Sequence, residues 1–196
     1  MKMNQKVKGN YGYITYKKKT SLGMALLMVL IGLGIFVVGL LLNKMSGRNV
    51  FSIFGMLMVL PMAKYLTTYI VVFPFKSPSQ ESFERFQQTC GDLEDVYIFS
   101  DLVLTSPEKV MNLDFMVVGN GYVVALQGKD KQETKYIQQY LEKGCRNWMS
   151  GMKVRVTTTE DGFYKEFKMR QNKNAGEPWD EKEREDVLAY LRSLLV

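Results

Sequence analysis

The chain has 196 residues, a formal net charge of +6 and no histidine, which excludes Ser-His nucleophile systems, HExxH zinc sites and histidine general bases. The charge is uneven, because residues 1–75 carry nine Lys or Arg and no acidic residue, whereas residues 76–196 carry 17 Lys or Arg and all 20 Asp and Glu. The basic balance therefore comes from the N-terminal part and gives no argument for nucleic-acid binding.

Residues 1–20 form a basic N-terminal segment that we expect to lie in the cytoplasm. The segment contains the lysine run Lys17, Lys18 and Lys19, shortly before the first apolar run. Lysines beside a membrane-spanning helix attract anionic lipid headgroups, with about 1 kcal/mol for each residue near the surface. We predict that these three lysines lie at the membrane surface.

Two apolar runs follow and predict an integral membrane protein. The first, residues 21–42, has 22 residues without a charge, and as a helix it would extend about 33 Å, enough for a hydrocarbon core of about 30 Å. Residues 43–50 form a short link that we place outside the cell, and residues 51–75 form the second predicted span. The predicted anchor is a membrane α-helical hairpin of two transmembrane helices.

The basic residues predict the orientation of this hairpin. Six lysines precede the first span, whereas the link carries only Lys44 and Arg48, and positively charged flanks stay on the cytoplasmic side. Both termini are then cytoplasmic, and the protein is a multi-pass protein of the plasma membrane. A cleaved signal peptide is the rival interpretation, but its apolar region would be shorter and an Ala-x-Ala-like site would follow it.

Two features of the hairpin have competing interpretations. Ala25, Gly32 and Gly39 form a stripe of small residues on the first helix. The stripe favours close packing on the second span, through Ser52, Gly55 and Ala63, or on a second chain. Lys64, in the second span, either extends along the helix to the cytoplasmic headgroups at the membrane surface or marks a polar site inside the membrane. The sequence leaves the oligomeric state open.

Residues 76–196 are predicted to form a single cytoplasmic α+β domain. The strongest local signal is Asn120-Gly121, which predicts a tight β-hairpin turn. Alternating apolar and polar residues in Phe163–Met169 suggest an optional strand. The expected order is α-β-β-β-α-β-(β)-α, with a helix over 80–89, strands over 96–105, 111–118 and 122–127, a helix over 130–143, strands over 152–159 and 163–169, and a helix over 180–195.

The predicted β-hairpin also carries a group of residues with possible chemistry: Asp114 near its start, and Gln127 and Lys129 at its end. Together with the order of elements, it resembles the PD-(D/E)xK nuclease superfamily and its nuclease-related domains, over about residues 79–158. The resemblance implies an αβββαβ core in which Asp114 binds a divalent metal such as Mg²⁺ and Gln127 is a second ligand. Lys129 would assist the attacking water or the scissile phosphate, and Glu84 in the first helix would be an extra acid.

The same residues also allow a plain interpretation, in which Asp114 and Lys129 are solvated residues at strand ends. A neutral Gln127 is a poorer ligand for Mg²⁺ than a carboxylate. We therefore expect a membrane-anchored cytoplasmic interaction or scaffold domain, without enzymatic activity, metal or cofactor, that contacts the lipid bilayer and another protein. Two alternatives stay open: a membrane-tethered PD-(D/E)xK-like metal-dependent nuclease or an inactive relative, and an accessory subunit of a larger membrane complex.

Overall fold

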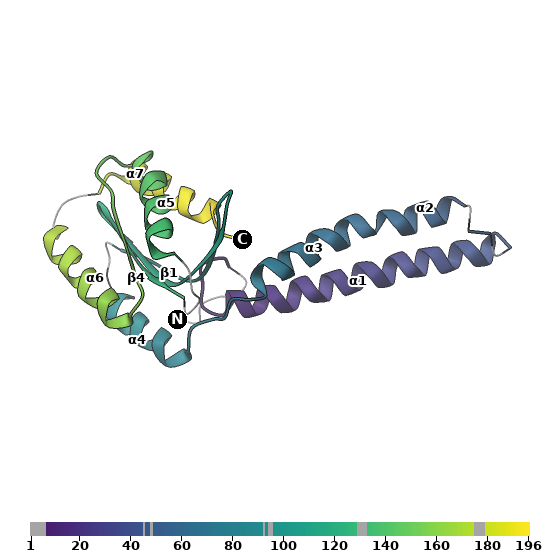
Figure 1. Cartoon of the computed structure of the whole chain (residues 1–196), viewed down its shortest axis with the longest axis horizontal. Coiled ribbons are helices and arrows are strands. Elements are labelled where there is room, and N and C mark those ends of the chain that lie inside the picture. The colour runs from purple at the N-terminus through teal and green to yellow at the C-terminus, as the bar shows by residue number, and fades with distance from the viewer. Residues whose placement is uncertain are drawn as a thin grey trace. The chain divides into compact units, whose positions relative to one another are not determined.

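The computed structural model describes residues 7–44, 46–47, 49–91, 93, 96–128, 133–174 and 179–196. The chain divides into two compact units (Figure 1). The sheet unit consists of Met1–Ile14 together with Phe75–Val196, and the hairpin unit consists of Thr15–Pro74. The sheet unit thus combines the domain expected over residues 76–196 with the segment that leads into the first helix.

The hairpin unit is made of helices. They are α1 (Tyr13–Leu42, whose first two residues belong to the sheet unit), α2 (Val50–Leu57) and α3 (Val59–Val72). Tyr13–Leu42 and Val50–Val72 are each long and apolar enough to cross a membrane, judged by length and composition. Helix α1 begins before the expected residue 21, and the three lysines at 17–19, which are good helix formers, lie inside it.

A break at Met58 separates α2 from α3. Asn49 caps the start of α2, since its side-chain Oδ1 accepts a hydrogen bond from the backbone N–H of Ser52 at 2.9 Å. Pro61 has no N–H and cannot donate to the carbonyl of Leu57, so the regular helical bonding is interrupted there.

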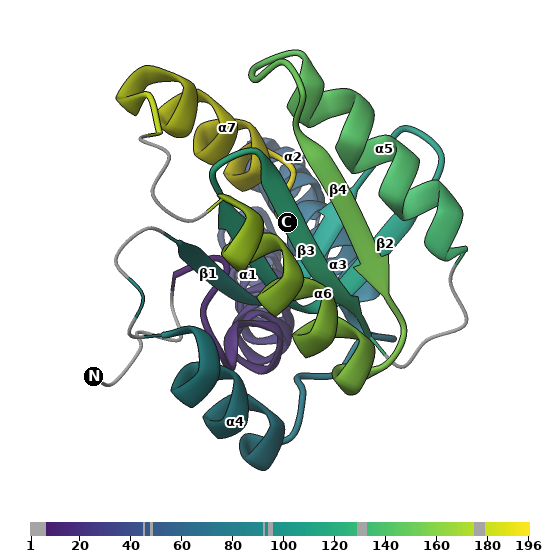
Figure 2. The ribbon, with the colours of Figure 1, turned by 90° about the vertical axis from the view of Figure 1, so that its left-hand side faces the viewer.

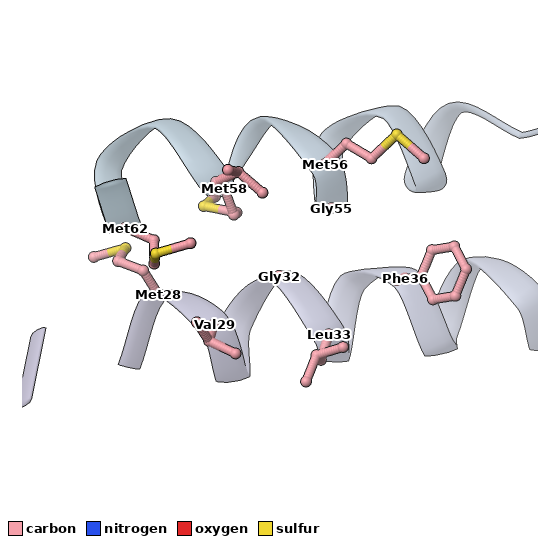
Figure 3. Close-up of a pocket in the computed structure, with 10 residues that line it drawn as sticks. Met28, Val29, Gly32, Leu33, Phe36, Gly55, Met56, Met58 and Met62 are labelled. Carbon is pink, nitrogen blue, oxygen red and sulfur yellow. The ribbon is translucent and has the colours of Figure 1, made fainter. Parts of the chain in front are cut away.

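The helices of the hairpin approach each other closely at two glycines, Gly32 on α1 and Gly55 on α2 (Figure 3). A Cβ atom on Gly32 would lie 3.0 Å from the Cβ of Met58 and 3.1 Å from the carbonyl oxygen of Gly55. A Cβ atom on Gly55 would lie 3.0 Å from the carbonyl oxygen of Gly32. The predicted packing of Gly32 on Gly55 within one chain is therefore present, and it requires the absence of side chains.

The sheet unit contains helices and a mixed four-stranded sheet, which confirms the α+β prediction at this level. Its strands are β1 (Tyr97–Thr105), β2 (Val110–Gly119), β3 (Tyr122–Gln127) and β4 (Lys153–Thr157), in the spatial order β1-β2-β3-β4. The first three strands are antiparallel, and β4 is parallel to β3. Gly121, with φ 73°, closes the predicted β2–β3 hairpin. A parallel pair needs a crossover, which α5 (Thr134–Arg146) provides.

Helices cover both faces of the sheet (Figure 2). Helices α5 and α7 (Glu181–Ser193) bury apolar side chains against one face, with Ile137 and Leu191 among them. Helices α4 (Gln80–Cys90) and α6 (Glu160–Asn174) cover the other face with aromatic side chains, including Phe86 and Phe163. Strands β2 and β3 are accordingly buried on both sides, which is why they are almost continuous apolar runs in the sequence.

The optional strand over Phe163–Met169 is wrong, because these residues lie within α6. Phe163, Tyr164 and Phe167 are buried together, which is the spacing of one helical face. Glu160 and Asp161 stand in the first turn, where negative charge stabilises a helix. The short alternating run was misread as a strand, and the order of elements is α-β-β-β-α-β-α-α.

Helix α5 also ends later than expected, since Gly144 lies inside it and does not stop it. A Cβ atom on this glycine would collide with the ring of Tyr190 on α7. The glycine therefore serves the close packing of α5 on α7. The first residues of the predicted helix, 130–132, lie outside the described part of the chain.

Candidate functional site: a buried polar cluster in the sheet

Buried polar side chains of the sheet unit gather on neighbouring strands. Among the described residues they are Ser100 and Asp101 on β1, Asn112 and Asp114 on β2, and Gln127 at the end of β3, with exposed fractions of 0, 1, 2, 9 and 7%. Burial of a carboxylate costs free energy unless hydrogen bonds or opposite charges compensate for it. A cluster of this kind inside an otherwise apolar sheet is a candidate functional site.

The strand register places Asp101 and Asp114 at the same level of β1 and β2, where the regular pairing of the two strands is interrupted. Ser100 pairs with Phe115 on one side of this position, and Leu102 pairs with Leu113 on the other side, without a shift between them. Asp101 has φ 53°, an unusual value for a residue other than glycine inside a strand. On the other side of β2, the pairing with β3 shifts between Leu113 and Phe115, so Asp114 lies at an irregularity of the sheet.

The carboxylate of Asp101 accepts hydrogen bonds from two chain segments. Its Oδ2 accepts a hydrogen bond of 2.7 Å from the hydroxyl of Ser77, which lies between α3 and α4. Backbone N–H groups of Gly12, Tyr13 and Ile14, where α1 begins, also donate toward its carboxylate. A carboxylate at this position stabilises the start of a helix, because the first N–H groups have no partner inside the helix.

The environment shifts the protonation of Asp101. Burial raises the pKa of its carboxyl, while the Ser77 hydroxyl and the backbone N–H groups at residues 12–14 lower it, and burial has the larger effect. Oδ1 has no partner with full hydrogen-bond geometry within the described chain. The site therefore favours a protonated carboxyl more than water does.

Tyr11 joins the same two segments next to Asp101. Its ring stacks on Phe83 of α4 with 4.2 Å between ring centroids, and its hydroxyl donates to the carbonyl of Pro78 at 3.4 Å. Burial raises the pKa of Tyr11, and the negative charges of Asp101 and Glu84 raise it further. The residues before α1 and after α3 are thus packed together beside β1.

Both ends of the described chain are also bound to strand β1 or to each other. The backbone N–H of Ser100 donates to the carbonyl of Gly9 at 2.8 Å, and that of Val196 donates to the carbonyl of Val103 at 3.0 Å. The Tyr13 hydroxyl donates to the carbonyl of Val196 at 3.1 Å. Strand β1 is an edge strand of the sheet, and these segments cover part of its open hydrogen-bonding edge.

The residues of the nuclease resemblance occupy different surroundings. Asp114 lies beside Gly128, where a Cβ atom would be 3.2 Å from its Oδ1. Gln127 pairs with Leu113, and its Oε1 accepts a hydrogen bond of 2.7 Å from the hydroxyl of Thr134 at the start of α5. Glu84 is exposed on α4 and accepts from Gln80 at 2.8 Å. Lys129 lies outside the described residues.

No group of three or more His, Cys, Asp and Glu side chains that could hold a metal ion occurs within the residues that the structure describes. The buried carboxylates of Asp101 and Asp114 belong to neighbouring strands, but they are not part of such a group. Asn112 adds a buried amide to the cluster, and its side-chain N–H donates to the carbonyl of Leu102 at 3.1 Å.

The lysines that were predicted to lie at a membrane surface belong to the hairpin unit. Lys17, Lys18 and Lys19 lie near the start of α1, and the Nζ of Lys18 is 5.7 Å from the ring centroid of Phe73. Lys64 is exposed on α3, and its backbone carbonyl accepts a hydrogen bond from the hydroxyl of Thr68 at 3.0 Å.

Asp101 is the residue that the sequence interpretation missed. Its signal was available, because it is the charged residue within the predicted strand over 96–105. Charged residues seldom occupy the middle of a strand that is buried on both faces. Its partners Ser77 and Gly12 could not be inferred, since both are distant in sequence.

No protein-family model, curated protein or solved structure matches this chain.

Proposed function

We propose that this chain is an integral protein of the plasma membrane with two spans and cytoplasmic termini, and that its α+β unit is an interaction or scaffold domain. Support comes from the helices Tyr13–Leu42 and Val50–Val72, with 30 and 23 residues. At 1.5 Å per residue they extend about 45 and 34 Å, enough for a hydrocarbon core of about 30 Å. The lysine asymmetry of the sequence supports the orientation.

The observation that carries the scaffold role is the pair of attachments at Asp101. A domain that is only tethered needs flexible linkers, whereas here Ser77 and the residues 12–14 are both bound to the same carboxylate. The chain segments that enter and leave the hairpin unit are therefore part of the sheet unit. A domain with such ordered connecting segments would present a partner-binding surface from an ordered base.

An accessory subunit of a larger membrane complex is the second candidate, and a specific observation favours it. The hairpin unit contains an apolar pocket of about 320 Å³, lined by methionines and small residues (Figure 3). Leu30 and Leu41 are 66% and 70% exposed on α1. These surfaces would contact lipid in a lone hairpin and other helices in a complex.

Site-specific photocrosslinking of the full chain in its native membrane distinguishes the two candidates. Crosslinkers at Trp148 and Val110 probe the sheet unit, where these side chains are 48% and 36% exposed, and crosslinkers at Leu30 and Leu41 probe the hairpin. The scaffold role predicts protein adducts from the sheet unit. Adducts from the hairpin alone would favour the accessory subunit, and adducts from neither would contradict both.

A degenerate or active PD-(D/E)xK-like nuclease is the third candidate. It is favoured by the order α4-β1-β2-β3-α5-β4, which is the αβββαβ order that the resemblance implies. A site that binds Mg²⁺ or Mn²⁺ stabilises the folded chain by about 2.7 kcal/mol at a hundredfold excess over the Kd. A metal-dependent thermal shift that is lost in Asp114→Ala, with cleavage of DNA or RNA, would make this the leading function.

A further inference from the structure

A second pocket, in the sheet unit, is lined by basic side chains. It has a volume of about 350 Å³ and lies between Gly121 and Gly151 on one side and the C-terminal half of α6 on the other. Its charged lining residues are Lys153, Arg170 and Lys173, without an acidic residue among those that line it. The volume lies at the lower end of the range of small-molecule sites, roughly 300–1,000 Å³.

The concentration of positive charge here runs against the composition of the surrounding chain. With the three lysines of Met1–Ile14, the sheet unit carries 20 acidic and 20 basic residues, so an average surface of the unit would be neutral. Lys153 is the first residue of the edge strand β4, and Lys173 lies in the last turn of α6. Each lysine alone has a structural role. A lysine on an edge strand hinders pairing with another chain, and a lysine in the last turn of a helix interacts favourably with the negative end of the helix dipole. Neither role explains why both line one cavity.

Arg170 is held in a fixed position within this pocket. Its Nε and Nη2 contact Oε1 of Glu166 at 2.9 and 2.8 Å, and its side chain is 20% exposed. The pair with Glu166 uses Nε and Nη2 and fixes the plane of the guanidinium at the pocket wall. A guanidinium that is already oriented loses little conformational freedom when it binds an oxyanion.

The backbone on the opposite wall contains two glycines with positive φ. Gly121 and Gly151 have φ 73° and 85°, which other residues adopt only with strain. The N–H of Lys153 donates to the carbonyl of Gly121 at 3.0 Å, which ties the start of β4 to the β2–β3 turn. The pocket therefore has two ordered walls.

From these observations we infer that this pocket, the basic pocket of Lys153, Arg170 and Lys173, binds the phosphate group of a small ligand. Two cationic ammonium groups and one planar guanidinium match the charge and the several acceptor oxygens of a phosphate. The phosphate belongs either to a soluble metabolite or to a lipid headgroup. This inference rests on the pocket alone and does not depend on the proposed scaffold role.

The test uses the full chain in neutral detergent, titrated with inorganic pyrophosphate and, separately, with a short-chain phosphatidylglycerol. Binding is read from the thermal melting temperature at constant ionic strength, because salt alone screens weak charge contacts. Lys153→Gln with Lys173→Gln is the test variant. Lys165→Gln with Lys168→Gln is the matched control, with the same charge change at two exposed positions of α6 that do not line the pocket.

The expected result is a saturable stabilisation of the wild type. The Kd of the probe should rise by about tenfold in the test variant, because charge-assisted hydrogen bonds are lost, and by less than about twofold in the control. Stabilisation by pyrophosphate alone would assign a soluble ligand, and stabilisation by the lipid alone would assign a headgroup. Equal weakening in both variants, or no saturable binding of either probe, would overturn the inference.

Discussion

The Oδ2 of Asp101 on β1 accepts a hydrogen bond of 2.7 Å from the hydroxyl of Ser77, and backbone amides at the start of α1 donate toward the same carboxylate. A buried aspartate with φ 53° is a strained and poorly solvated residue. Such a residue keeps its place only when its contacts compensate for the strain and the desolvation. Its contacts here are the two segments that join the sheet unit to the hairpin unit, which makes Asp101 the residue to test first.

The first prediction concerns the pH dependence of stability at Asp101. Burial raises the pKa of this carboxyl, so the folded state binds its proton more tightly than the unfolded chain does. The contribution of Asp101 to stability is therefore largest at acidic pH, and it falls as the pH rises from the unfolded pKa through the higher folded pKa. In Asp101→Asn this titration is absent.

Thermal melts of both proteins between pH 4 and pH 8 measure this effect, expressed as the difference between wild type and variant. The wild type should gain stability relative to Asp101→Asn as the pH falls, since protonation removes the buried charge. A constant difference for Asp101→Asn would show that its carboxyl has no raised pKa.

The second prediction concerns the packing of the hairpin at Gly32. Gly32→Leu should separate α1 from α2, because even a Cβ atom there would lie 3.0 Å from Met58. Gly34→Leu is the matched control, because a Cβ at Gly34 meets nothing within 4 Å. Cysteines introduced at Met28 and Met62, which line the same pocket, should crosslink readily in the control and poorly in Gly32→Leu. Equal crosslinking in both would contradict the close glycine contact.

The third prediction concerns Lys64 on α3. If its ammonium reaches the headgroups, Lys64→Leu should leave membrane insertion unchanged, because Leu removes an insertion cost of about 2.5–3.5 kcal/mol for a lysine at the helix centre. Lys64→Glu should reduce the yield or disturb the orientation. Both are measured by protease protection of membranes that contain the tagged chain. A loss of function in Lys64→Leu with normal insertion would instead support a polar site inside the membrane.

Local patterns in the sequence predicted the elements that such patterns decide. Asn120-Gly121 predicted the β2–β3 turn, and the long apolar runs predicted α1 and the α2–α3 pair, although α1 begins at Tyr13 and not at residue 21. The interpretation of Phe163–Met169 failed because a seven-residue run shows period 2 and period 3.6 about equally well. The capping signals of Glu160 and Asp161 would have favoured the helix.

The candidate site was predicted only in part, because its geometry depends on contacts across the chain. Asp114 and Gln127 were identified, yet the register that places Asp101 and Asp114 at the same level depends on strand pairing. The bond from Ser77 to Asp101 spans 24 residues, and no local pattern specifies it. The basic pocket was missed for the same reason, since Lys153 and Lys173 come from different elements.

The measurement that tests the central claim most directly is cysteine labelling of intact cells with a membrane-impermeant maleimide. Burial raises the pKa of Cys90 and Cys145 to about 12, so the native thiols should react little, and serine at both positions removes them altogether. A hairpin with cytoplasmic termini predicts labelling of Ser46→Cys in intact cells, and labelling of Ser193→Cys only after the membrane is permeabilised. Labelling of Ser193→Cys in intact cells, or of neither position after permeabilisation, would contradict the proposed topology.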